Sequence, residues 1–168
     1  MAPSDTAPDP EDGPPDETRL AAVGTIDGAL GQIRRSMVRR GLGRRVLDDL
    51  GVAIEPALVE VLDAVAELTG AEADGVAVST VAARLGVDPS QASRLVAETV
   101  ATGLLARHAS QRDGRRSVLR LTPAGEALIE ATRQRKRAIL LAHVEDWSDS
   151  ELADFARLLQ RFSAIARG

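Results

Sequence analysis

Residues 79–103 read STVAARLGVDPSQASRLVAETVATG and contain the clearest structural signals in the chain. Ser79 is a candidate N-cap, because a hydroxyl there accepts a hydrogen bond from a backbone N–H of the first helical turn. The helix that follows is predicted over 80–85. Gly86 is expected to end it, because glycine adopts the left-handed conformation of a C-cap at no steric cost.

A second helix is predicted after a turn of a few residues. Asp88 is its N-cap, Pro89 fits the first helical position, and Gln91 completes a variant of the capping box. This helix is predicted over Pro89–Thr102, and Gly103 ends it. Two helices joined by a short turn that contains glycine form a helix-turn-helix.

The next residues predict a β-hairpin. Two strand-like runs, 104–108 and 117–121, flank a polar stretch, and the second run alternates between polar and apolar residues. Asp113 and Gly114 lie between the runs, and this dipeptide is a strong signal for a hairpin turn. A hairpin directly after a helix-turn-helix makes a winged helix-turn-helix, with the wing at about Ala109–Arg116.

Helical periodicity also extends upstream of this lobe. Gly41 and Gly43 bend or end a first helix, and 44–50 adds a further turn or two. Pro56 opens the next helix. The first helix carries an apolar stripe at helical spacing, made of Ile26, Leu30, Ile33 and Met37.

Two more helices are predicted downstream. Thr122 caps a long helix that begins at Pro123 and runs to about Val144. Ser148 and Glu151 form the capping box of a final helix. The apolar face of that helix comprises Leu152, Phe155, Leu158, Leu159, Phe162 and Ile165.

The charge is distributed unevenly, although the net charge is only −4. Residues 1–18 hold six acidic residues and no basic one, and they are rich in proline, so we expect a disordered tail. This tail is either a plain solvated leader or a shield for a basic face. Residues 79–120 hold seven arginines against three acidic residues. The local electrostatic field, and not the net charge, determines which partner a surface attracts. This segment is therefore expected to bind nucleic acid.

An α-helix fits the DNA major groove, where its N-terminal residues reach the base edges. Glutamine pairs with adenine and arginine with guanine, while hydroxyls at a helix N-terminus are suited to bind phosphate. Outward positions at the starts of both helices, together with the wing, therefore form the predicted DNA-binding set. Its members are Ser79, Thr80, Ser90, Gln91, Ser93, Arg94, Arg112, Arg115 and Arg116.

The run from Ser79 to Gly125 resembles the regulators of the MarR family. The resemblance covers roughly residues 20–166 and implies a mainly α fold with a small β-hairpin wing. It implies a six-helix protomer that interlocks with a second copy in a homodimer. The matching motifs are Asp113-x-Arg115 followed after three residues by Leu119-x-Leu121-Thr122 and then Gly125, and Ser93-Arg94-Leu95-Val96 followed by Gly103-Leu104-Leu105.

The resemblance also implies roles and partners. The arginine that matches Arg115 enters the minor groove, and the aspartate that matches Asp113 orients it. The implied partner is double-stranded DNA with a palindromic operator, and the implied activity is repression released by a small-molecule effector that the sequence does not identify. The apolar faces of the outer helices support a dimer independently, since such faces need burial, although packing on their own subunit is the alternative.

Four segments are therefore predicted: a tail over 1–18, an N-terminal dimerisation region over 19–55, a DNA-binding lobe over 56–122 and C-terminal dimerisation helices over 123–168. The chain has no cysteine and two histidines, which excludes thiolate chemistry and argues against a metal site. No cofactor, catalytic motif, membrane span or signal peptide is expected, and the predicted location is the cytoplasm. A winged-helix adaptor that binds protein instead of DNA is the alternative function.

Overall fold

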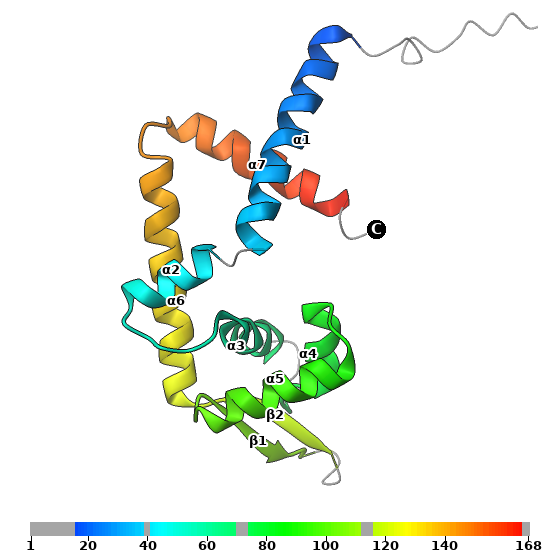
Figure 1. The fold of residues 1–168 in the computed structure, drawn as a ribbon, viewed down its shortest axis with the longest axis vertical. Helices are drawn as coiled ribbons and strands as arrows, with labels where there is room; N and C mark the ends of the chain where they lie inside the picture. The colour runs from blue at the N-terminus through cyan, green and yellow to red at the C-terminus, as the bar shows by residue number, and fades with distance from the viewer. Residues whose placement is uncertain (1–15, 39–40, 70–73, 112–115, 166–168) are drawn as a thin grey trace, which may run out of the picture. The chain divides into compact units, whose positions relative to one another are not determined.

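The computed structural model describes residues 16–38, 41–69, 74–111 and 116–165 (Figure 1). The chain divides into two compact units, one ending at Gly41 and the other beginning at Leu42. The elements in chain order are α1 (Glu17–Val38), α2 (Gly41–Asp49), α3 (Pro56–Thr69), α4 (Val78–Leu85), α5 (Pro89–Ala101), β1 (Leu105–Ala109), β2 (Ser117–Leu121), α6 (Pro123–His143) and α7 (Asp149–Ile165).

The first unit contains α1. This helix begins at Glu17, whose negative charge suits the positive end of the helix dipole. The last two residues of the predicted tail are therefore helical, and residues 1–15 lie outside the described part of the chain. Large apolar side chains along α1 are exposed, with Ile26 at 48% and Ile33 at 54%.

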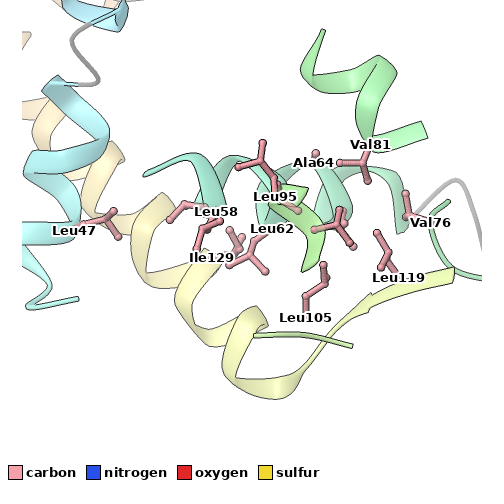
Figure 2. Packing of buried hydrophobic residues seen from close by; sticks show 14 residues of the cluster. Leu47, Leu58, Leu62, Ala64, Val76, Val81, Leu95, Leu105, Leu119 and Ile129 are labelled. Carbon is pink, nitrogen blue, oxygen red and sulfur yellow. The ribbon is translucent and has the colours of Figure 1, made fainter. Parts of the chain in front are cut away.

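The second unit is built around one aliphatic core. Val61, Leu62 and Val65 of α3 have no exposed surface and form its centre. Leu105 of β1 and Leu119 of β2 close the core from the hairpin (Figure 2). Complete burial of a side chain of this size contributes about 1.5–3 kcal/mol to folding.

The sheet is a two-stranded antiparallel hairpin in the described residues. Leu105 lies opposite Leu121, and Ala109 lies opposite Ser117. Val76 adds a single bridge to Leu119, with the two N–H groups donating across it at 3.0 and 2.8 Å. Val76 is a single bridging residue and not part of a longer strand, because α4 already begins at Val78.

Two ion pairs hold α6 against the lobe. The guanidinium of Arg133 lies 2.8 Å from Asp63 of α3, and that of Arg135 lies 2.6 Å from Asp49 of α2. Each pair links α6 to one of these helices.

Helix α7 begins at the predicted capping box. The N–H of Ser148 donates to Oε2 of Glu151 at 2.8 Å, and the N–H of Glu151 donates to Oγ of Ser148 at 3.3 Å. Hydrogen bonds from the Ser148 side chain and backbone lower the pKa of Glu151. Along α7 the apolar side chains are exposed, including Phe155 at 48%. The ring of Phe155 packs edge-on against that of Trp147, with 5.3 Å between the ring centroids.

The predicted fold class is confirmed: the structure is mainly helical and has a winged helix-turn-helix with a β-hairpin. The described residues form seven helices where six were expected. The additional one is α2, which is separate from α1 and buries Val46 and Leu47 against the second unit's core. None of the helices in the described ranges is long and apolar enough to cross a membrane.

Candidate nucleic-acid interface

The turn between α4 and α5 forms as its residues predict. Gly86 ends α4 in the left-handed conformation, with φ of 65°. Asp88 caps α5, and its Oδ1 accepts the N–H groups of Ser90 at 2.9 Å and Gln91 at 3.0 Å. These bonds satisfy N–H groups that have no partner within the helix, so the first turn of α5 is held firmly.

Helix α5 buries one face and exposes the other. Ala92 and Val96 have no exposed surface and join α5 to the lobe. The four predicted contact residues at its start, Ser90, Gln91, Ser93 and Arg94, are all exposed. Arg94 meets Glu98 one turn further on at 3.5 Å, and two-thirds of its side chain remains exposed. A surface pair of this kind is weak, so the guanidinium can exchange it for another acceptor.

Helix α4 begins at Val78, two residues earlier than predicted. Its N-cap is Ala77, which has no side chain able to cap, so the expected capping role of Ser79 is wrong. The helix starts there because Val78 and Val81 both pack inward, which draws residue 78 into the helical turn. Ser79 is exposed and Thr80 half-buried in the first turn, and their predicted phosphate contacts stay predictions.

The first strand of the hairpin, β1, packs against α5. The N–H of Ser110 donates to the carbonyl of Arg116 at 2.8 Å, which extends the pairing beyond the strands. Arg116 is exposed where β2 begins. Arg112, Asp113 and Arg115 lie outside the described residues, so their predicted roles stay predictions.

Asp74 is a functional candidate that the sequence reasoning missed. Its carboxylate accepts hydrogen bonds from the hydroxyl of Ser110 and from the N–H of Gln111, the latter at 2.7 Å. The backbone carbonyl of Asp74 accepts from Arg120 at 3.1 Å. A single aspartate in a polar loop gives no local pattern, and its partners are 36 to 46 residues away in the sequence.

A second tight junction joins the end of the helix-turn-helix to α6. The hydroxyl of Thr122 donates to the carbonyl of Gly103 at 2.8 Å and accepts the N–H of Gly125 at 3.1 Å. The N–H of Thr122 donates to the carbonyl of Leu104 at 3.1 Å. A Cβ on Gly125 would lie 2.1 Å from that carbonyl oxygen, so only glycine permits this approach.

Within the described residues, no group of three or more histidine, aspartate and glutamate side chains is arranged to hold a metal ion. A hollow of about 370 Å³ lies beside α2, lined among others by Arg44, Leu47 and Ile54. Arg44 pairs with Glu55 across it at 3.3 Å.

The fold and the exposed start of α5 beside a hairpin define a winged helix-turn-helix protein. The sequence model of the MarR family matches residues 59–116. The match runs from α3 through the wing and confirms the resemblance drawn from the sequence. No curated protein matches the chain.

Solved structures share this fold. A MarR family protein from Bacillus stearothermophilus is 23% identical, with a TM-score of 0.72 over 89% of this chain and 98% of that one. CouR from Rhodococcus jostii RHA1 bound to p-coumaroyl-CoA is 26% identical, with a TM-score of 0.58 over 83% and 90%. MepR from S. aureus bound to ethidium bromide is 20% identical, with a TM-score of 0.57 over 80% and 95%. The first and third likenesses establish the fold alone.

Proposed function

We propose that this chain is a transcription regulator that binds double-stranded DNA at specific sequences in the cytoplasm. One observation carries the proposal: the capped first turn of α5 presents Gln91 and Arg94 to solvent, next to an arginine-rich hairpin. In this proposal α5 enters the major groove, where glutamine and arginine side chains contact base edges. The wing, at about Ala109–Arg116, lies at the minor groove, and Arg115 enters it.

The protein acts in this proposal as a homodimer. The support is the exposed apolar surface on two separate elements: Leu20, Val23 and Ile26 on α1, and Leu158 and Phe162 on α7. Exposed apolar surface of this extent is typical of an interface. A two-fold dimer presents two copies of α5, so the expected operator is a palindrome with half-sites about one helical turn apart.

The test is fluorescence anisotropy with the DNA upstream of the protein's own gene and a scrambled duplex of equal composition, at several salt concentrations. We expect a steep salt dependence and at least about tenfold preference for the native duplex. Equal and weak binding to operator candidates selected from the whole genome, as well as to the scrambled duplex, would contradict the proposal and favour the protein-binding adaptor.

Arg115→Ala tests the wing within the same assay. The substitution is expected to weaken DNA binding at least about tenfold, because a groove contact of arginine contributes roughly 1–3 kcal/mol. The melting temperature should not change. Unchanged affinity would refute the assignment of the wing.

We further propose that the regulator is a repressor released by an aromatic small molecule. The support is that CouR is bound to p-coumaroyl-CoA and MepR to ethidium bromide, and that the hollow beside α2 offers about 370 Å³. Titrating each compound into the protein–DNA complex tests the effector proposal. Release of DNA that rises with compound concentration and reaches a plateau supports it. Release of DNA by neither compound would contradict an effector of these two kinds.

A further inference from the structure

The segment before α4 is bound to the base of the wing at three successive residues. Asp74 accepts two hydrogen bonds through its carboxylate, from the Ser110 hydroxyl and the Gln111 N–H, immediately beyond β1. Ser110 is only 8% exposed, and its hydroxyl donates to a half-buried carboxylate. A charged acceptor makes such hydrogen bonds shorter and about twice as strong as neutral ones.

The next two residues hold the same segment against β2. Gly75 has φ of +110°, and a Cβ there would lie 2.9 Å from Cγ2 of Val118, so the backbone approaches the strand as only glycine can. Val76 then pairs with Leu119. Asp74 is therefore presented to the wing from a backbone whose position is fixed by the core of the lobe.

We propose that Asp74 is the positioning residue of the wing, setting the direction in which the hairpin leaves the lobe and so the depth at which it meets DNA. This inference rests on the proposed function. The carboxylate joins the far end of β1 to the loop that leads into α4, which is the first helix of the helix-turn-helix. The wing and the two helices thus share one fixed point and meet the duplex as one surface.

Electrostatics alone predicts the opposite result, which makes the proposal easy to test. Asp74 contacts Ser110 and Gln111 at the end of β1, and its negative charge repels DNA phosphates. Removing that charge should strengthen DNA binding if Asp74 has no positioning role. If it positions the wing, the same substitution should weaken binding although the protein becomes more positive.

The experiment compares Asp74→Asn, Asp74→Ala and the control Glu60→Gln, which removes one negative charge from an exposed residue of α3. We expect Asp74→Ala to weaken binding to the native duplex roughly tenfold. Asp74→Asn should weaken it less, because the amide oxygen still accepts one of the two hydrogen bonds. Glu60→Gln should bind as tightly as the wild type or slightly more tightly. Equal or tighter binding by both Asp74 variants would overturn the proposal.

A measurement without DNA separates this inference from the proposed function. Hydrogen exchange at the Gln111 N–H should be faster by about tenfold or more in Asp74→Ala than in the wild type, beyond the change that any loss of global stability in the variant explains. Unchanged exchange would overturn the positioning role whatever the DNA result. A wild-type chain that binds no duplex would overturn the proposed function, and the exchange rates would still decide whether Asp74 holds the hairpin.

Ser110→Ala examines the contact from the other side. If the Ser110 hydroxyl and the Asp74 carboxylate act as a unit, the double variant Asp74→Ala/Ser110→Ala should lose little more DNA affinity than Asp74→Ala alone. Strictly additive losses would show that the two residues act independently and would overturn this contact as the means of positioning.

Discussion

The lobe and the last helix use the same residue types with opposite results. Leu62 of α3 and Leu119 of β2 have no exposed surface, whereas Leu158 and Leu159 of α7 are 50% and 49% exposed. The lobe encloses its apolar residues within one chain, and α7 leaves its own uncovered. An amphipathic pattern therefore shows which face of a helix will be buried, but not whether the covering surface belongs to the same molecule.

The largest effect expected from this contrast is in the lobe. Leu62→Ala should lower the free energy of unfolding by about 2–5 kcal/mol, because it leaves a cavity in a core that closes within one chain. Urea unfolding followed by circular dichroism measures this. The loss should be the same at low and high protein concentration, and a loss that varies with concentration would show that the lobe's core also depends on a partner.

A charged residue on α7 should act on association instead. Leu159→Asp is expected to weaken the proposed dimer by roughly 100-fold or more, since it would put a carboxylate into the proposed apolar interface. Analytical ultracentrifugation over a range of concentrations measures the shift from dimer to monomer. Gln160→Glu, which changes charge at the next residue of α7, is the matched control. A Leu159→Asp protein as dimeric as the wild type would contradict a role for the apolar face of α7 in association.

Substitutions on the exposed face of α5 should change DNA binding and leave both stability and association unchanged. Gln91→Ala and Arg94→Ala should each weaken binding to the native duplex by about 1–3 kcal/mol and relax preference at one base pair. Anisotropy on single-base operator variants detects this. Equal losses on native and scrambled duplexes would indicate phosphate contacts instead of base contacts.

The smallest effect concerns the start of α7. Hydrogen bonds from Ser148 lower the pKa of Glu151, so the folded protein resists protonation of this carboxylate more than the unfolded chain does. The resulting stabilisation is present above the ordinary pKa of glutamate and is lost as the pH falls through the lowered value. Glu151→Gln should slightly lower the melting temperature at neutral pH. It should also make the melting temperature fall less steeply between pH 7 and 3, which thermal melting measures. Identical pH profiles would contradict a role for the ionised cap.

Local chemistry explains why much of the fold could be predicted from the sequence. Asp88 and Thr122 act within three residues, so their capping roles are visible in the sequence alone, and both are confirmed. Ser79 was misassigned because tertiary packing moved the start of α4 to Val78. In the candidate site, the exposed residues of α5 follow from helical periodicity, whereas Asp74 does not. Its contacts depend on where the chain returns after more than thirty residues, and periodicity carries no information about that.

The junction at Thr122 has a mechanical consequence. One hydroxyl bonds to the carbonyl that follows α5 and to the first turn of α6, and Gly125 brings the two backbones into direct contact. Neither segment can slide past the other without breaking these bonds. A rotation of α6 is therefore transmitted through this junction to α5, the helix proposed to enter DNA.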